Sequence, residues 1–322
     1  MSKLKDILIN KKIGKSIWFM RQAGRYLPEF RKIRSQNLNF IDLCLNSELS
    51  SEITLQPITR FNLDSAIIFS DILMVPYALG QKVEFIKDMG PKLEEFNLKL
   101  FTTNNEKSFT QKLLPVYEAI SKTRNKLDKE KSLIAFVGAP WTLLIYMLNL
   151  KLDKKNIDYE KIKSKKDEIS LILNKLNEYL FIHIENQVNA GADVVQIFDS
   201  WAGLIKPENF EHYCVEPNSK LVNFCKKKNI PVICFPRGIG KNYKKFNDIV
   251  KPDGLNIDYE VDPEWAKINL KNVVIQGGLD PKILLNSEGD IMSSAKKYLD
   301  TFQDLPYVFN LGHGLLPSTD PD

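Results

Sequence analysis

The feature that most constrains the fold of this chain is an alternation of short apolar runs with longer helical patterns. Eight runs rich in Ile, Val and Phe recur, each bounded by Gly, Pro, Asp or Ser. Segments with helical periodicity lie between them, such as residues 171–187 and 208–227. Strands that alternate with helices predict right-handed βαβ units and a parallel sheet. The predicted strands are residues 17–20, 65–69, 133–137, 193–198, 231–235, 254–257, 273–275 and 307–310.

Eight such units close naturally into a (β/α)8 TIM barrel, and we predict this fold of the α/β class. The chain has 322 residues, a length that one such barrel fills. No linker rich in Pro, Gly or Ser divides it, so we predict a single domain over residues 1–322. The alternative is a doubly wound open sheet, but no Gly-x-Gly-x-x-Gly motif follows the first predicted strand as that fold would require.

The uncharged stretch over residues 133–150 raises the question of a membrane span. It is barely long enough to cross a bilayer, and Gly138, Ala139 and Pro140 interrupt it. We interpret it as a buried strand, a tight turn and an apolar helix face. The chain does not begin with the apolar segment of a secretory signal, and its four scattered cysteines contain no Cys-x-x-Cys pair, which indicates a reducing compartment. We therefore expect a cytoplasmic protein with no membrane partner.

The charge balance favours a small acidic ligand. Lysine and arginine exceed aspartate and glutamate by 45 − 40 = +5. This mild excess suits an acidic small molecule and is too weak to indicate nucleic-acid binding. A hydrophobic fraction of 43% and a charged fraction of 26% are those of an ordinary globular protein, which excludes a disordered, collagen-like or coiled-coil chain.

Polar residues follow the predicted strands, at the end where a (β/α)8 barrel builds its active site. Arginine is scarce, with seven residues against 38 lysines, yet four arginines fall within fourteen residues after the first strand. One interpretation is a clamp for an anionic ligand, because the guanidinium fork grips a carboxylate in two places. The alternative is a basic helix face that packs on acidic neighbours. The four are Arg21, Arg25, Arg31 and Arg34.

Asp71 and His313 are further candidates at strand ends. Asp71 lies between two apolar stretches, so we expect it to be sunk in a pocket and to need N–H donors; a structural cap of the next helix is the alternative. His313 stands between two glycines after the last predicted strand, and glycines let the backbone approach a ligand closely. A structural histidine is the alternative. His212 and Cys214 lie two apart in a predicted helix and cannot hold one metal ion together.

The motifs around these residues resemble those of a known family. The segment WFMRQAGRYLPEFR, residues 18–31, resembles the N-terminal signature of uroporphyrinogen decarboxylases, and FVGAPWTL, residues 136–143, resembles their second signature. AIIFSDIL, QIFDSWAG, FPRGIG, QGGLDP and NLGHG match in family order. The resemblance runs from residue 18 to residue 314, and a stretch such as RQAGRYLPEF is highly specific.

The resemblance implies a (β/α)8 barrel that forms a homodimer with its two active-site clefts facing each other. It implies an enzyme, a carboxy-lyase that removes carbon dioxide from the four acetate side chains of uroporphyrinogen III and yields coproporphyrinogen III in haem biosynthesis. It also implies that no metal, flavin or other cofactor takes part. The substrate carries eight carboxylates, which suits the arginine cluster and the positive net charge.

The same resemblance assigns roles to individual residues. Asp71 is implied to bind the pyrrole N–H groups and to stabilise the cationic reaction intermediate. Arg21 and Arg25 are implied to be catalytic with it, because they hold acetate or propionate groups. Arginine is a poor acid, so no residue is assigned as the proton donor. The implied substrate-binding residues are Arg21, Gln22, Ala23, Gly24, Arg25, Asp71, Tyr146, Ser200 and His313, of which residues 22–24 act through their backbone.

The chain departs from the family pattern in two places. Gly278 stands where the family commonly has asparagine, and we expect a small loss of local order there. The chain stops at Asp322, soon after NLGHG, whereas family members usually continue for about another helix. We therefore expect a barrel that lacks its last C-terminal helix, and a loss of stability from the uncovered flank.

Two other functions compete with this one. A zinc-dependent or corrinoid methyltransferase of the same superfamily needs thiolate and imidazole ligands at the barrel rim, where this chain has Arg237 and His313. A non-catalytic porphyrinogen carrier is the other alternative. The intact set of acid and arginines argues against a carrier, and substitution of Asp71 separates it from an enzyme.

Overall fold

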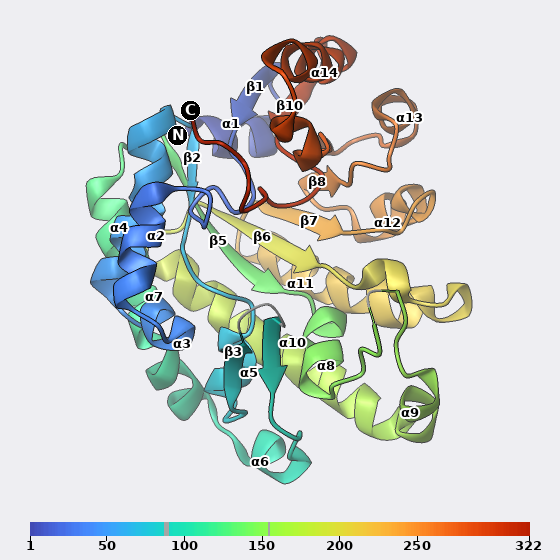
Figure 1. Ribbon diagram of the computed structural model, residues 1–322. Coiled ribbons are helices and arrows are strands. Elements are labelled where there is room, and N and C mark those ends of the chain that lie inside the picture. Colours follow the sequence, from blue (N-terminus) through green and yellow to red (C-terminus); the bar gives the residue numbers. More distant parts are fainter. Residues whose placement is uncertain (87–89, 154) are drawn as a thin grey trace.

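The computed structural model describes residues 1–86, 90–153 and 155–322. At its centre, neighbouring strands run parallel and helices pack outside them, as Figure 1 shows. This central sheet is, within the described chain, made of eight strands: β1 (Gly14–Ile17), β2 (Ser65–Ile67), β5 (Ser132–Gly138), β6 (Val194–Asp199), β7 (Val232–Pro236), β8 (Gly254–Ile257), β9 (Val274–Gly277) and β10 (Pro306–Phe309).

The sheet forms a nearly closed barrel. Its strand order is β1-β10-β9-β8-β7-β6-β5-β2, so β1 and β2 are the two edges. At this seam the Ile17 backbone N–H donates to Asp64 Oδ2 at 2.8 Å, and the Asp64 N–H donates to the Ile17 carbonyl at 3.0 Å. The predicted (β/α)8 barrel is confirmed, and the doubly wound open sheet is wrong.

The helices are mostly the connections between successive strands. A short antiparallel hairpin, β3 (Val83–Ile86) with β4 (Gly90–Leu93), lies outside the barrel sheet. The helices are α1 (Lys3–Asn10), α2 (Pro28–Gln36), α3 (Phe40–Cys44), α4 (Ser47–Phe61), α5 (Met74–Ala78), α6 (Leu98–Thr103), α7 (Glu106–Lys126), α8 (Pro140–Met147), α9 (Tyr159–Ser164), α10 (Lys166–Asn189), α11 (Glu216–Lys227), α12 (Asn242–Val250), α13 (Pro263–Asn269) and α14 (Glu288–Thr301), with short 3-10 or π segments at η1 (Ala202–Leu204), η2 (Pro207–Asn209), η3 (Glu211–Val215) and η4 (Pro281–Leu285).

The core has two layers. The larger one fills the space between the strands and the outer helices. The smaller one lies inside the barrel, where Leu4, Ile7 and Leu8 of α1 meet inward side chains of the strands such as Ile134 and Val308. Because α1 directly precedes β1, this apolar plug closes the end at which the strands begin. The opposite end is left for polar groups.

The strand predictions agree with the structure to within about one to three residues. The largest shift is at the first strand, predicted at residues 17–20 and found at Gly14–Ile17, because the chain leaves the sheet after Ile17. The uncharged stretch over residues 133–150 is the predicted strand, turn and helix, β5 followed by α8. Within the described residues, no helix is long and apolar enough to cross a membrane. The β3–β4 hairpin has no counterpart among the predictions.

The helix predicted over residues 208–227 is interrupted. It begins with η2, passes through the π segment η3 and continues as α11. Pro217 lies just after the π segment, and proline has no N–H to give to the carbonyl four residues earlier. A π turn accommodates that missing hydrogen bond.

Residues 310–322 form no helix. This last segment runs from β10 back toward α2 and β2 (Figure 1). The Leu315 N–H donates to the Met20 carbonyl at 2.9 Å, and Asp322 forms an ion pair with Arg60 of α4. The segment therefore ties the end of the barrel strands to the helices that follow β1.

Candidate active site

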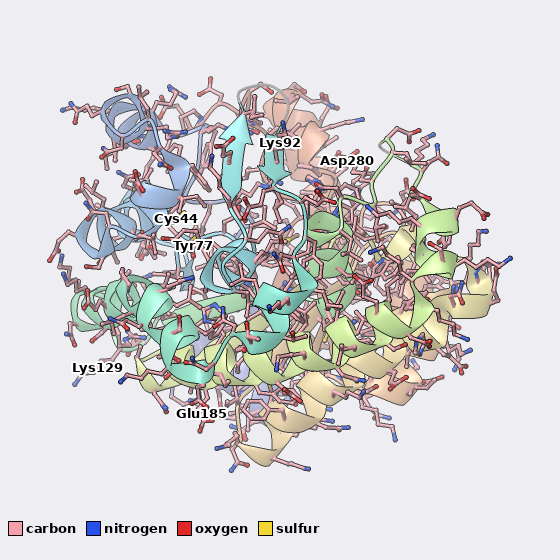
Figure 2. All side chains as sticks on the ribbon, turned by 90° about the horizontal axis from the view of Figure 1, so that it is seen from below. Cys44, Tyr77, Lys92, Lys129, Glu185 and Asp280 are labelled. Atoms are coloured by element: carbon pink, nitrogen blue, oxygen red, sulfur yellow. The ribbon has the colours of Figure 1, made fainter. Side chains whose placement is uncertain are left out.

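The residues predicted from sequence meet at the end of the barrel where the strands finish. They lie in connections that leave five different strands: Arg21 and Arg25 after β1, Asp71 after β2, Tyr146 on α8 after β5, Ser200 after β6 and His313 after β10. Figure 2 places Lys92 of the β3–β4 hairpin and Asp280, which follows β9, toward one side of the molecule, and Lys129, which precedes β5, toward the other. The hairpin thus lies on the side of the strand ends.

The loop that carries Arg21 is held by hydrogen bonds from three directions. The Met20 N–H donates to Asn310 Oδ1 at 3.1 Å. Gln22 is fully buried; its Oε1 accepts from the Phe19 N–H at 2.9 Å and its Nε2 donates to the Ser65 carbonyl at 2.9 Å. The Gln22 side chain therefore stabilises the fold, and its N–H donates to the Phe19 carbonyl at 3.0 Å, which leaves the backbone N–H groups of Ala23 and Gly24 available to a ligand.

Arg21 itself adopts a left-handed backbone conformation with φ of 63°. Such a conformation costs free energy in a residue that is not glycine, so the surrounding contacts must hold it there. Its aliphatic stem lies against Gly314, where an added Cβ would come within 2.4 Å of Arg21 Cδ. Gly314 thus provides the space in which Arg21 lies.

Gly312 has a similar role on the other side of His313. A Cβ added there would lie 2.1 Å from the Tyr259 backbone nitrogen. The two glycines that flank His313 therefore allow close contact between parts of the protein itself. The sequence did not predict this structural role of the two glycines.

The seven arginines divide into two groups. Four donate to carbonyls or carboxylates: Arg31 to the carbonyls of residues 25 and 26, Arg34 to residue 37, Arg60 to Glu29 and Asp322, and Arg124 to Asp193 and three carbonyls. The guanidinium groups of the other three make no hydrogen bond or ion pair with any described residue. These three are Arg21, Arg25 and Arg237, and all follow barrel strands. Of the four clustered arginines, only Arg21 and Arg25 are thus left for an anionic ligand.

Asp71 is the acid that faces these cations. Burial raises the pKa of its carboxyl from 3.8 to about 6, against the effect of a hydrogen bond from the Leu73 N–H and of the nearby Arg21 charge. Oδ1 accepts that Leu73 bond at 2.8 Å, and Oδ2 has no hydrogen-bond partner in the described chain. Oδ1 therefore supports the turn before α5 without capping that helix, whose N-cap is Leu73, and Oδ2 keeps the capacity to accept a hydrogen bond from a ligand.

The charges in this cluster influence one another. Burial is the main cause that lowers the pKa of Arg21; the positive charges of Arg25 and Arg237 lower it further, whereas Asp71 and Tyr146 raise it. Burial likewise raises the pKa of the Tyr146 phenol, and Asp71 adds to that rise. Arg21 nevertheless keeps solvent-accessible surface. The cluster is thus an accessible group of positive charges near the Asp71 carboxylate.

His313 is neutral at physiological pH. Burial lowers the pKa of its imidazole from 6.5 to about 4, and the charges of Arg21 and Arg237 lower it further. Its Nδ1 lies 3.3 Å from the Gly314 carbonyl. Ser200, which directly follows β6, is half-buried. Its hydroxyl makes no hydrogen bond within the described residues. Both are uncharged polar groups on the same rim.

Asp199, at the end of a barrel strand, is not among the predicted site residues. Asp199 ends β6, is 1% exposed, and accepts hydrogen bonds from Thr142 Oγ1 at 2.7 Å and Asn218 Nδ2 at 3.2 Å. Burial raises the pKa of its carboxyl to about 6. Thr142 Oγ1 in turn accepts from the Trp201 N–H at 3.1 Å, so this network holds the chain on both sides of Ser200. Its position at a strand end is the only signal that the sequence carries for it.

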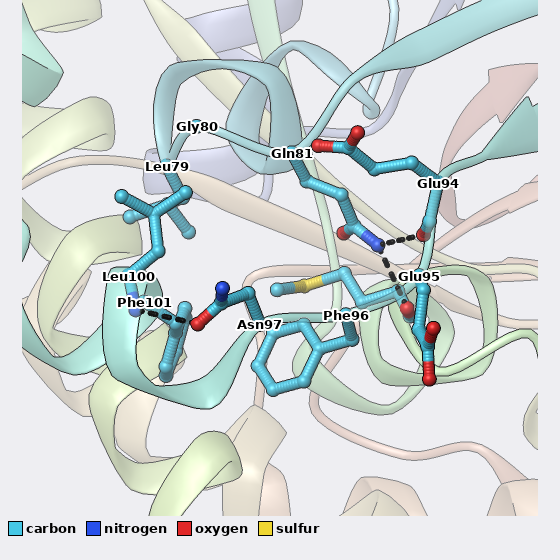
Figure 3. Close-up of a pocket in the computed structure, with 10 residues that line it drawn as sticks. Leu79, Gly80, Gln81, Glu94, Glu95, Phe96, Asn97, Leu100 and Phe101 are labelled. Atoms are coloured by element: carbon cyan, nitrogen blue, oxygen red, sulfur yellow. Dashed lines mark hydrogen bonds between the residues drawn. The ribbon is translucent and has the colours of Figure 1, made fainter.

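Two hollows in the described structure lie away from this rim. One, shown in Figure 3, lies beside the hairpin and α6, where Gln81 Nε2 donates to the carbonyls of Glu94 and Met147. The other lies between α2, α4 and α7, and three of its lining residues are glutamates. Neither is lined by a predicted site residue. The described residues also contain no group of three or more His, Cys, Asp or Glu side chains able to hold a metal ion.

Comparison with known proteins gives a consistent result. Residues 15–322 match the family described as uroporphyrinogen decarboxylase (URO-D). Two bacterial proteins named uroporphyrinogen decarboxylase are close relatives. That of Orientia tsutsugamushi (strain Ikeda) is 43% identical over 309 residues, 94% of this chain and 90% of that protein. That of Rickettsia bellii (strain RML369-C) is 41% identical over 310 residues, 95% of this chain and 91% of its own.

Among solved structures, a methyltransferase from Methanosarcina mazei is similar to this chain with a TM-score of 0.80. The match covers 99% of this chain and 94% of that chain, at 19% sequence identity. At this identity the likeness shows the fold alone.

Proposed function

The chain belongs to the uroporphyrinogen decarboxylase family, and we propose that the rim of Arg21, Arg25 and Asp71 is its active site. The enzyme is a carboxy-lyase of haem biosynthesis: it removes carbon dioxide from the four acetate side chains of uroporphyrinogen III and yields coproporphyrinogen III. One observation carries the assignment of the site. Within the described residues, Arg21 has no hydrogen-bond or ion-pair partner and lies near the Asp71 carboxylate, which keeps one oxygen free, and Arg25 lies near Arg21.

This arrangement is complementary to the substrate. Uroporphyrinogen carries carboxylates around its edge and pyrrole N–H donors at its centre. Arg21 and Arg25 supply cations for the edge, and a bidentate arginine–carboxylate pair is among the stronger hydrogen-bonded contacts. Asp71 Oδ2 supplies an acceptor for the central N–H groups. The two glycines beside His313 keep the Arg21 stem and the last loop packed together, so the cation has a defined position.

The chemistry requires an anion next to a cationic ring. A proton added to a pyrrole carbon makes an iminium, which accepts the electron pair of the C–C bond as carbon dioxide leaves. A second proton converts the resulting methylene into a methyl group, and the ring proton is then lost. Each acetate thus exchanges carbon dioxide for one proton. The Asp71 carboxylate, fixed beside the ring before the reaction, stabilises the positive charge that develops.

The neutral groups complete the binding of side chains. Tyr146 and Ser200 offer hydroxyl donors, and neutral His313 offers a polar ring without a charge. The backbone of residues 22–24 adds donors on the Arg21 side of the rim through the N–H groups of Ala23 and Gly24, because the Gln22 N–H already donates to the Phe19 carbonyl at 3.0 Å. We assign all of these, with Arg21, Arg25 and Asp71, to substrate binding.

The activity and the role of Asp71 are tested together. Anaerobic incubation with uroporphyrinogen III, followed by oxidation and chromatography, counts the carboxylates on the products; we expect a series from eight to four. Asp71→Asn removes the charge and keeps the shape, and we expect kcat to fall by roughly 100-fold to 1000-fold, the range for loss of one preorganised electrostatic contact, with KM changed much less.

Asp280→Asn is a matched control, because it removes a negative charge from the same end of the barrel and keeps the oxygen that accepts from the Lys282 N–H. We expect it to retain turnover close to that of the unmodified enzyme. A carrier would lose only affinity in Asp71→Asn. Unchanged turnover in that variant would show that our role for Asp71 is wrong.

We also propose that the whole chain, residues 1–322, acts as one domain and as a homodimer in the cytoplasm. The eight-stranded sheet uses strands from Gly14 to Phe309, which supports a single folding unit among the described residues. All four cysteines are buried free thiols, which suits a reducing compartment. Light scattering coupled to size-exclusion chromatography measures the mass; a dimer is expected, and a mass of about 37 kDa would contradict it.

A further inference from the structure

Arg237 follows β7 and has no part in the site assigned above. The strand order β1-β10-β9-β8-β7 makes β7 the fourth neighbour of β1 around the barrel. In a ring of eight strands this is the position across from β1. The Arg237 loop therefore lies on the side of the rim opposite to the loop that carries Arg21 and Arg25.

The backbone of Arg237 is fixed to the neighbouring strand connection. Its N–H donates to the Asp199 carbonyl at 3.1 Å, and its carbonyl accepts from the Gly203 N–H at 2.9 Å. Both backbone groups of this residue are thus bonded to the segment that begins at the end of β6.

Asp258, at the end of β8, holds the same loop from the other side. It is 3% exposed, and its Oδ2 accepts from the Gly238 N–H at 2.8 Å and from the Tyr243 hydroxyl at 3.0 Å. Gly238 has φ of 80°, and a Cβ added to Gly203 would come within 2.6 Å of the Gly238 carbonyl oxygen. Two close-packed glycines and a buried carboxylate therefore determine the position of the Arg237 Cα, from which its side chain extends.

The backbone of Arg237 is held in place, but its guanidinium has no partner among the described residues. Arg237 is half-buried, and its side chain makes no hydrogen bond or ion pair with any described residue. The neighbouring Asp258 carboxylate is already bonded to three donors, the third being the Glu260 N–H. The positive charge of Arg237 acts on the site, because it contributes to the lowered pKa of both Arg21 and His313. A half-buried cation without a counter-charge is a place where a ligand anion is favoured.

We propose that Arg237 binds a carboxylate of the substrate on the side of the macrocycle opposite to the carboxylates held by Arg21 and Arg25. This inference rests on the proposed function and extends it. The substrate carries acetate and propionate groups around its whole edge, so cations on one side alone would leave it free to tilt. A third cation across the barrel sets the plane of the ring over Asp71.

The test compares Arg237→Gln and Arg237→Met with the unmodified enzyme. Both remove the charge, and methionine keeps an unbranched stem, so at least one is expected to fold with an unchanged melting temperature. We expect KM for uroporphyrinogen III to rise by roughly tenfold to 100-fold, the range for loss of a charge-assisted hydrogen bond, and kcat to change by less. Arg237→Lys keeps the charge without the fork and should restore part of the affinity.

Lys241→Gln is the matched control, since this exposed lysine lies four residues further along the same loop and its loss changes the net charge equally. Its KM is expected to stay unchanged. Competitive inhibition by coproporphyrinogen III, which has propionates and no acetates, identifies the group bound. If Arg237 holds a propionate, the inhibition constant rises as KM does; if it holds an acetate, only KM rises.

The outcomes separate this inference from the proposed function. Activity in the unmodified enzyme together with an unchanged KM in folded Arg237→Gln and Arg237→Met overturns the role of Arg237 and leaves the function intact. An equal rise of KM in Lys241→Gln also overturns it, because net charge would then explain the effect. A folded, unmodified enzyme without activity on uroporphyrinogen III overturns both.

Discussion

At the scale of single residues, the arginines show what the sequence predicts about ligand binding and what only the structure adds. All four clustered arginines lie within fourteen residues, and their spacing alone does not distinguish ligand-binding from structural members. The structure does: Arg31 and Arg34 are held by carbonyls of their own segment, whereas Arg21 and Arg25 keep their donors for another partner. Hydrogen bonds to carbonyls depend on where the chain turns, which residue types do not specify.

Asp71 also leads to a pH prediction at this scale. Its pKa is raised to about 6, so the charged form that the role proposed for Asp71 requires exists above that pH and is lost below it. We expect kcat/KM for uroporphyrinogen III to be level near neutral pH and to fall by about tenfold for each pH unit well below 6. The pKa of His313, about 4, lies too low to produce this limb.

Asp199 is the control for that assignment, because burial raises the pKa of its carboxyl to about 6 as well. The Asp199→Asn variant should keep the acidic limb of the pH profile if Asp71 is the group that titrates. A profile that is flat between pH 5 and 7 in the unmodified enzyme, or a limb that disappears in Asp199→Asn, would contradict the prediction.

At the scale of elements, the connections after the strands decide where the side chains of the site lie. The last of them, with Gly312, His313 and Gly314, is packed against Tyr259 on one side and Arg21 on the other. The sequence predicted that these glycines matter at this end of the barrel. It could not show that their neighbours are protein atoms, because Arg21 and Gly314 are almost 300 positions apart and meet only when β10 pairs with β1.

Gly314→Ala tests this packing. A Cβ at 2.4 Å from Arg21 Cδ forces the arginine side chain to move, and overpacking of this kind costs about 1–3 kcal/mol. We expect kcat/KM to fall by roughly tenfold or more, since the displaced guanidinium loses its place beside Asp71. Steady-state kinetics and thermal unfolding measure the two effects separately.

Gly289→Ala is the control for that substitution. Gly289 lies in α14 and has no atom within 4 Å of an added Cβ, so alanine should leave activity unchanged and stabilise the helix slightly. If Gly314→Ala retains full activity, the contact with Arg21 does not position the guanidinium.

At the scale of the whole molecule, the seam between β1 and β2 is where the barrel closes. No strand pairing joins these two edges in the described chain; instead, the Asp64 backbone and side chain bond to Ile17. Lys3 forms an ion pair with the same carboxylate at 3.0 Å. The seam matters for function because Arg21 follows β1 and Asp71 follows β2, so the two principal charges of the site lie on either side of it.

Asp64→Ala tests how much this closure contributes to stability. It removes the acceptor of the Ile17 N–H, and an unsatisfied donor costs about 1–3 kcal/mol of unfolding free energy. Lys3→Ala removes only an exposed ion pair and should cost less than about 1 kcal/mol. Urea unfolding of both variants gives the comparison. Equal losses in the two would show that the Ile17–Asp64 hydrogen bond does not stabilise the seam.

The predictable and unpredictable parts of this protein differ for a physical reason. Apolar periodicity and glycine-bounded runs are local, so the sequence by itself determined the eight strands, their parallel arrangement and the end at which Arg21, Asp71 and His313 meet. The β3–β4 hairpin lacked such a pattern and was missed. Hydrogen-bond partners are not local. Only the tertiary structure decided which arginines stay unpaired, because this depends on contacts between segments far apart in the chain. The same holds for the burial of Asp199 with Thr142 and for the position of the Arg237 backbone across the barrel from Arg21.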